Sequence, residues 1–152
     1  MTSWAAFESD APELAATGRA MIERTGMGEA LLATVLGAGL PRINPIDAKI
    51  IDGHLVGYLI VGSAKLDALE GDGRFALHAP VDPAAPSEFL IRGRAHAVTD
   101  PALEATAAAS WSFDVDDGYR LFEFDIEQCV LGERLDAEAW PPRYSSWRPS
   151  AG

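Results

Sequence analysis

The stretch Gly62-Ser63-Ala64-Lys65-Leu66-Asp67-Ala68-Leu69-Glu70-Gly71-Asp72-Gly73-Arg74 joins two β-type runs, residues 54–61 before it and 75–78 after it. A hydroxyl, a lysine and one amphipathic helical turn stand together here. Free backbone N–H groups at a helix start, with Ser63 and Lys65 beside them, suit a phosphate. The same pattern also fits a capped connecting helix with a solvated Lys65, so spacing alone leaves both interpretations open.

The composition is that of a globular domain with an acidic surface. The chain has 152 residues, of which 48% are hydrophobic and 23% charged, and this is enough to bury a real core. Its formal net charge of −11 disfavours nucleic acid and anionic membranes as partners, because both would be repelled. Only two lysines occur, Lys49 and Lys65. An anion site must therefore concentrate the few cations locally.

The single cysteine and the acidic N-terminal residues favour a cytoplasmic protein. Cys129 is the only cysteine, so no intrachain disulfide forms. It falls in a strand-like run, where we expect a small core residue and not a nucleophile. The first ten residues are acidic and lack a basic leader, and no run approaches the length of a membrane span.

The N-terminal segment predicts a helix. Asp10-Ala11-Pro12-Glu13 reads as a capping aspartate, a proline in the first turn and a glutamate three residues after the cap. Gly26 or Gly28 ends the segment, to which we assign no chemistry.

A hairpin is expected next. The apolar run 30–36 is closed by Gly37-Ala38-Gly39 and followed by the run 41–47. Pro41 and Pro45 restrict the second strand to an edge or a bulge. Missing N–H donors beside Arg42 and Asn44 fit a surface for a flat ligand as well as a plain edge strand.

The remaining runs complete an antiparallel sheet. We expect a long strand over 88–99, bulged near Gly93, a short helix after Asp100-Pro101, and a closing strand over 119–131. The connections are too short for parallel crossovers. The sequence therefore predicts a mainly β (α+β) fold: a six-stranded antiparallel split β-barrel with an N-terminal helix and short connecting helices. We expect a single domain over 1–152, with a helical segment over 1–28, the barrel over 29–133 and a tail over 134–152.

The ordered set of motifs over residues 29–101 resembles the pyridoxamine-phosphate-oxidase-like, FMN-binding split β-barrel family, with a weaker match for the last strand. The motifs are Leu32-Ala33-Thr34-Val35, Pro41-Arg42-Ile43-Asn44-Pro45-Ile46, Gly62-Ser63-Ala64-Lys65, Gly71-Asp72-Gly73-Arg74-Phe75-Ala76-Leu77 and Ile91-Arg92-Gly93-Arg94-Ala95.

The resemblance implies a homodimer with two flavin sites at the subunit interface. Carried over by position, Lys65 would pair with the FMN phosphate, and Tyr58 and Ser63 would approach it. The isoalloxazine ring and ribityl chain would be lined by Arg42, Ile43, Asn44, Pro45 and Ile46.

Two departures from the family pattern affect the expected reaction. Oxidase members carry an R-x-V-L-L-K strand and a G-S-R-K turn, whereas Asp47 and Ala64 stand at the corresponding positions here. The closing Arg-x-His motif of the oxidases is also missing. An acid at Asp47 would repel a phosphorylated pyridoxamine, so we do not expect the namesake reaction.

Other candidate residues carry weaker signals. His54, His78 and His96 lack the short spacing of a metal site, and we expect no metal. The acidic run 114–117 reads as a solvated loop. The tail aromatics Trp140, Tyr144 and Trp147 would pack on the barrel or the partner subunit, or close over the exposed face of the flavin.

The function expected from the resemblance is that of an FMN-dependent oxidoreductase. It would transfer a hydride or electrons between a nicotinamide donor and a small organic acceptor, with the redox chemistry supplied by the cofactor. No residue stands out as catalytic. The alternatives are a deazaflavin-dependent reductase of the same fold and a non-enzymatic flavin- or haem-binding module, with His78 or His96 as an axial ligand.

Overall fold

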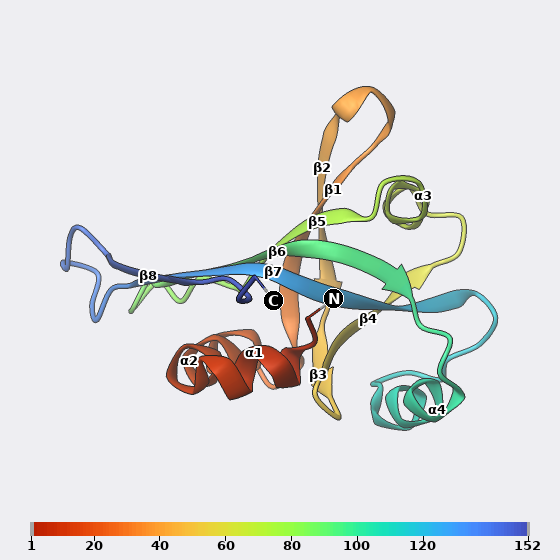
Figure 1. Cartoon of the computed structure of the whole chain (residues 1–152), viewed down its shortest axis with the longest axis horizontal. Coiled ribbons are helices and arrows are strands. Elements are labelled where there is room, and N and C mark those ends of the chain that lie inside the picture. The colour runs from red at the N-terminus through yellow and green to blue at the C-terminus, as the bar shows by residue number, and fades with distance from the viewer. Residues whose placement is uncertain (1, 152) are drawn as a thin grey trace.

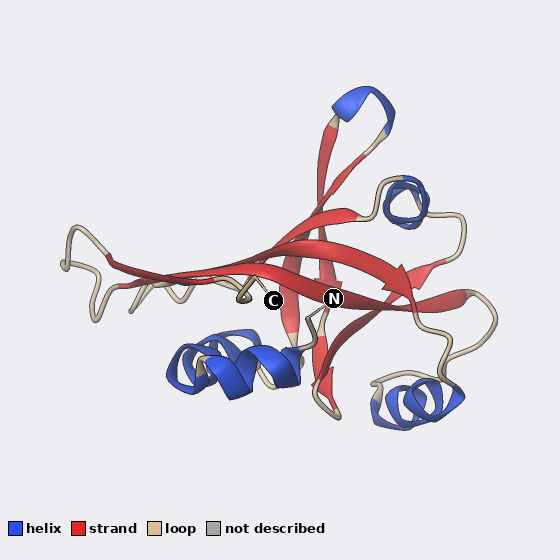
Figure 2. Cartoon of the chain, viewed as in Figure 1, coloured by secondary structure: helices blue, strands red, loops and turns tan. Residues whose placement is uncertain are grey.

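The computed structural model describes residues 2–151, in which one curled antiparallel sheet carries four helices on its outside (Figures 1 and 2). The strand order is β2-β1-β5-β6-β7-β4-β3, and β8 pairs with β7 beside this path. The helices are α1 (Trp4–Asp10), α2 (Pro12–Ile22), α3 (Ala64–Gly71) and α4 (Pro101–Ser110), with a 3-10 turn at Gly37–Gly39. The strands are β1 (Glu29–Val35), β2 (Pro41–Asp47), β3 (Lys49–Ile51), β4 (His54–Ile60), β5 (Arg74–His78), β6 (Glu88–Ala97), β7 (Tyr119–Glu133) and β8 (Arg143–Trp147).

The predicted mainly β, antiparallel split-barrel fold is confirmed, with eight strands in place of six. The two additional strands are short. β3 forms a hairpin with β4 across the Asp52-Gly53 turn, where both residues have positive φ values of 49° and 79°. β8 adds the C-terminal tail to the far half of β7.

The helix predicted after Asp10-Ala11-Pro12-Glu13 is confirmed as α2, with Pro12 and Glu13 in its first turn, but its N-cap is Ala11 and not Asp10. A further helix, α1, precedes it. Ser3 caps α1, because its Oγ accepts a hydrogen bond from the N–H of Ala6 at 3.2 Å. Asp10 is the last residue of α1, and Ala11 is the N-cap of α2 without a side-chain cap. Asp10 instead accepts a hydrogen bond from Trp147 Nε1 at 2.5 Å. The acid thus ties the first helix to the last strand.

The barrel interior is filled by aromatic and aliphatic side chains. Phe89, Phe122 and Phe124 are fully or almost fully buried there, and Phe75 stacks edge-on against Phe124 at 5.0 Å. α1 adds Trp4 and Phe7, so this helix is part of the core. Cys129 is fully buried, as predicted.

The two halves of the sheet meet where β2 approaches β4. A Cβ built on Gly57 of β4 would lie 3.0 Å from the carbonyl oxygen of Asp47, so a larger residue at Gly57 would push the strands apart. The β1–β2 hairpin forms as predicted, with Thr34 opposite Arg42, and β2 is an edge strand that accommodates both prolines. No helix among residues 2–151 has the length and apolar character needed to span a membrane.

Candidate functional site

The Ser63–Lys65 turn is a capped helix start, as the sequence indicated. Ser63 is the N-cap of α3, and its Oγ accepts a hydrogen bond from the N–H of Leu66 at 3.3 Å. Leu66 and Leu69 anchor the helix in the core. The first N–H groups of α3 have no partners inside the helix. Its N-terminus therefore offers oriented donors beside the Ser63 hydroxyl.

Lys65 is a cation without an acidic partner. It makes no ion pair or side-chain hydrogen bond with any residue in the described part of the chain, and its side chain is half-buried. By contrast, Arg74 pairs with Asp72 at 2.6 Å and Arg120 with Glu70 at 2.6 Å. In a chain with 23 acids and 12 bases, an unpaired lysine next to a helix N-terminus is suited to an anion.

The β2 residues predicted to line a flavin divide between two faces of the hairpin. Arg42, Asn44 and Ile46 alternate on the face shared with buried Thr34. The Oγ1 atom of Thr34 is buried and has no hydrogen-bond partner among residues 2–151. A buried polar atom without a partner is costly in an apo protein. This hydroxyl is enclosed by protein, so a ligand on that face would contact Arg42 and Asn44 and not Thr34.

The opposite face of the hairpin is apolar and exposed. Ile43 is 68% exposed, and Pro45 lies opposite Leu31, which is 48% exposed. Pro45 and Ile46 also line a cleft of about 570 Å³ together with Leu31 and Asp47. The hairpin therefore presents an apolar wall, with one acid at its end.

Tyr58 lies in a different environment from the predicted phosphate residues. Its ring packs edge-on against Trp111 at 4.8 Å, under α4. Burial, followed by the neighbouring Glu104 carboxylate, raises the pKa of Tyr58. It lines a cleft with Asp116 and Asp117, so its surroundings are acidic and unsuited to an anion.

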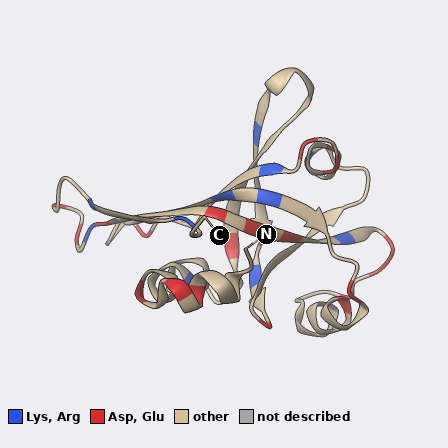
Figure 3. Cartoon of the chain, viewed as in Figure 1, with Lys and Arg blue, Asp and Glu red and all other residues tan. Residues whose placement is uncertain are grey.

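Charges are unevenly distributed over the sheet. Figure 3 shows basic positions on β2, β5 and β6 and acidic positions along β7 and the N-terminal helices. The predicted cations Arg42 on β2 and Lys65 on α3 make no ion pairs among residues 2–151. An anionic ligand is therefore favoured there, over the β7 side of the molecule.

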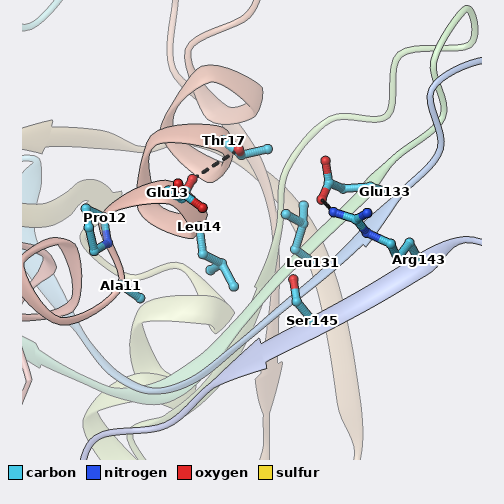
Figure 4. A pocket seen from close by; sticks show the side chains of 9 residues that line it. All are labelled: Ala11, Pro12, Glu13, Leu14, Thr17, Leu131, Glu133, Arg143 and Ser145. Carbon is cyan, nitrogen blue, oxygen red and sulfur yellow. Dashed lines mark hydrogen bonds and ion pairs between the residues drawn. The ribbon is translucent and has the colours of Figure 1, made fainter.

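A further groove of about 670 Å³ contains none of the predicted site residues. It runs between the start of α2 and the β7–β8 ribbon, and Figure 4 shows Leu14 and Leu131 facing one another across it. Its polar rim is an ion pair between Glu133 and Arg143 at 4.0 Å. The groove is lined by no histidine or cysteine, and the hydroxyl of Thr17 donates to the carbonyl of Glu13, so we assign it no chemistry.

Three solved structures place this arrangement among known folds. A haem-binding protein from Mycobacterium smegmatis superposes with a TM-score of 0.64 at 18% identity, over 88% of this chain and 57% of that protein. A pyridoxamine 5'-phosphate oxidase-related, FMN-binding protein from Nostoc punctiforme gives a TM-score of 0.62 at 14% identity, over 95% and 96% of the two chains. A NimC/NimA family protein from Clostridium acetobutylicum gives 0.62 at 14% identity, over 83% and 93%.

The chain has the split-barrel fold of the pyridoxamine 5'-phosphate oxidase-related proteins. The resemblance suggested by the sequence motifs is confirmed at this level. No family model and no curated protein matches the sequence. The chain spans little more than half of the mycobacterial protein, so that protein's ligand is not carried over with the fold.

Proposed function

We propose that this split barrel binds FMN in a homodimer and transfers a hydride or electrons between a nicotinamide donor and a small organic acceptor. The observation that carries the proposal is the unpaired Lys65 ammonium beside the Ser63-capped start of α3. The FMN-binding neighbour with the same fold supports the choice of cofactor.

Ser63 and Lys65 are suited to hold the phosphate. The ammonium supplies a charge-assisted contact, and the Ser63 hydroxyl can donate a hydrogen bond while its oxygen accepts from Leu66 N–H. The free N–H groups of α3 add oriented donors, and the helix start carries partial positive charge. These groups fit an anion better than any other ligand class.

The β1–β2 hairpin is suited to hold a flat ring. Pro41 and Pro45 remove N–H donors from the edge strand, and Ile43 and Leu31 expose apolar surface. Arg42 and Asn44 place a guanidinium and an amide on the other face. A planar group with polar edges would satisfy both kinds of surface.

A second copy of the chain would complete such a site. Single exposed apolar residues are normal, but Leu31 and Ile43 are exposed next to one another on two paired strands. Covering them by a partner subunit would remove this surface from water and enclose the ring.

When bound, the flavin supplies the redox chemistry, and the chain binds and orients it. Asp47 at the end of the hairpin disfavours an anionic substrate beside the ring. This charge is consistent with an acceptor that lacks a phosphate, and it separates the proposed reaction from that of a pyridoxamine-phosphate oxidase.

Two other cofactors have an observation in their favour. Asp47 and Ala64 stand where the oxidases carry cations, which favours a deazaflavin that relies less on its phosphate site. The mycobacterial neighbour binds haem, which keeps a haem-binding module as an alternative.

The absorbance spectrum of freshly purified protein, followed by separate titrations with FMN, a deazaflavin and haem, tests the proposal. We expect saturable FMN binding at one flavin per chain, tighter than deazaflavin binding, and a dimer by light scattering. Flavin reduction by a nicotinamide donor should then follow. Failure to bind FMN, or a Soret band with haem as the only binding signal, would contradict the proposal.

A further inference from the structure

Two histidines and two carboxylates meet on the outer face of the sheet, away from the hairpin. Glu123 and Asp125 alternate along β7 on the same face, and His96 of β6 lies opposite Glu123 in the register. His54, at the start of β4, reaches the same carboxylate. No sequence motif joins the members of this cluster, because they are spread over three strands.

The cluster has the dimensions of a metal site. His96 Nε2 lies 2.8 Å from Asp125 Oδ2 and 4.0 Å from Glu123 Oε1, and one ligand atom from each of the three residues lies within 4.8 Å of the others. Ligand atoms around a tetrahedral zinc ion, each about 2.0–2.2 Å from the metal, are roughly 3.3–3.6 Å apart. Small side-chain adjustments would bring all three atoms to that spacing.

The contacts around the cluster fix how His96 faces the two carboxylates. His96 Nδ1 lies 3.2 Å from the carbonyl oxygen of Ala97, which can only accept. Nδ1 therefore carries a hydrogen. A second ring proton on Nε2 accounts for its 2.8 Å approach to the Asp125 carboxylate, and a bound metal ion would take the place of that proton. Hydrogen bonding of the second ring nitrogen to a carbonyl is the usual arrangement for a metal-bound histidine.

His54 orients the second ligand. Its Nδ1 lies 2.6 Å from Glu123 Oε2, and a carboxylate can only accept, so the imidazole donates to this oxygen. The other oxygen, Oε1, is then turned toward His96 and Asp125. His54 is a positioning residue and not a ligand in this arrangement.

Among residues 2–151 the two carboxylates have no lysine or arginine partner, and only His54 and His96 approach them. Their side chains are only 12% and 8% exposed, and Asp125 Oδ2 has no hydrogen-bond partner among residues 2–151, although His96 Nε2 is close. Arg94 lies opposite Asp125 in the register, but its guanidinium contacts Glu127 at 3.7 Å and the carbonyl of Asp72 at 3.4 Å. Two adjacent buried acids with an unused oxygen are costly without a positive charge.

We propose that His96, Glu123 and Asp125 bind a divalent transition-metal ion such as Zn²⁺, with His54 holding Glu123 in place. One imidazole and two carboxylates suit zinc and its neighbours better than Mg²⁺, which favours oxygen ligands alone. Three protein ligands leave at least one coordination position open. The half-exposed rings of His54 and His96 give access from solvent.

Titration of the purified, chelator-treated chain with Zn²⁺ by calorimetry, and with Co²⁺ by visible spectroscopy, tests this site. The unmodified chain should bind one ion per chain, with visible d–d bands for Co²⁺, and excess Mg²⁺ should not compete. His96→Gln and Asp125→Asn should each weaken Zn²⁺ binding at least 10-fold. Metal affinity falls by roughly 10–100-fold even when only the residues that orient the ligands are altered.

Matched controls separate the site from surface binding. His78 also directs Nδ1 at a neighbouring carbonyl, that of Ala79 at 2.7 Å, and Glu127 is an exposed acid on β7. His78→Gln and Glu127→Gln should leave the affinity within twofold. Equal weakening by controls and site variants, or no binding by the unmodified chain, would overturn the proposal.

A second measurement needs no substitution. Zn²⁺ that binds only the folded site raises the melting temperature of the unmodified chain in a concentration-dependent manner. An unchanged melting temperature at saturating Zn²⁺ would instead show that His96 and Asp125 form a plain imidazolium–carboxylate pair. Because the site shares no residue with the proposed flavin site, loss of metal binding and loss of FMN binding are separate outcomes.

Discussion

Gly93 of β6 lies against the backbone of Asp125 on β7, so closely that a Cβ on Gly93 would collide with the Asp125 carbonyl oxygen. The register of the two strands shifts between Arg92 and Gly93, which marks the bulge predicted at this position. Beyond the bulge, Asp125 and Glu123 face outward beside His96. Glycine at position 93 thus allows β6 and β7 to pack closely beneath the acidic cluster.

Gly93→Ala should destabilise the fold by about 1–3 kcal/mol, the range for overpacking a close-packed site. The clash is with backbone, which cannot rotate away. Chemical denaturation measures the effect. Gly71→Ala is the matched control, because no atom lies within 4 Å of a Cβ there, and it should be neutral or mildly stabilising in α3. Similar stabilities for Gly93→Ala and the unmodified chain would show that β6 and β7 can separate at the bulge.

Arg74→Met should raise the pKa of Asp72 toward the value of an ordinary aspartate. The hydrogen bonds from Arg74 hold the pKa of Asp72 at about 2, well below the ordinary value for an aspartate. Because the folded pKa is depressed, the stability from this pair is present above the unfolded pKa and is lost as the pH falls through about 2. Carboxyl NMR titration of Asp72 measures the change, with Arg148→Met as the control. A midpoint unaltered by Arg74→Met would contradict the assignment.

Cys129 should react with thiol reagents only after unfolding. Burial raises the pKa of its thiol, and the side chain is fully enclosed in the barrel core. Since it is the only cysteine in the chain, a single labelling trace reports on it. We expect full labelling in denaturant and, under native conditions at pH 8, labelling no faster than global opening. Rapid native labelling would show that the β7 core opens locally.

Long periodic strands and turn residues made most of the fold predictable. The β1–β2 hairpin, the bulge at Gly93 and the Asp100-capped helix α4 all follow local rules, and the structure confirms each of them. These features depend on residues close together in the sequence, where turn chemistry and alternation are decisive.

Tertiary pairing accounts for what the sequence did not show. β3 has three residues and no alternation to detect, and β8 exists because β7 is long enough to offer a second edge. Asp10 looked like a cap, but the better signal was Ser3, whose hydroxyl caps α1. A capping pattern at two nearby positions cannot be resolved from propensity alone.

The candidate site also combines features that local sequence predicts with features that depend on tertiary pairing. Ser63 as a cap and β2 as an edge strand were predictable from spacing. The acidic surroundings of Tyr58 and the cluster around Glu123 depend on register across strands, which no single-strand pattern encodes. One signal for the cluster was present: Glu123 and Asp125 alternate with Phe122, Phe124 and Ile126 in the middle of β7.

FMN affinity of Lys65→Ala, measured by calorimetry against the unmodified chain, tests the central claim most directly. Lys49→Ala is the matched control, since the Lys49 ammonium is already bound to the Ser110 carbonyl at 2.8 Å and lies 4.8 Å from the Trp111 ring centre. The account predicts that Lys65→Ala weakens FMN binding by about 1.5–3 kcal/mol, roughly 10- to 150-fold, and that Lys49→Ala does not. FMN affinity unchanged by Lys65→Ala would contradict it, because the phosphate would then lie elsewhere.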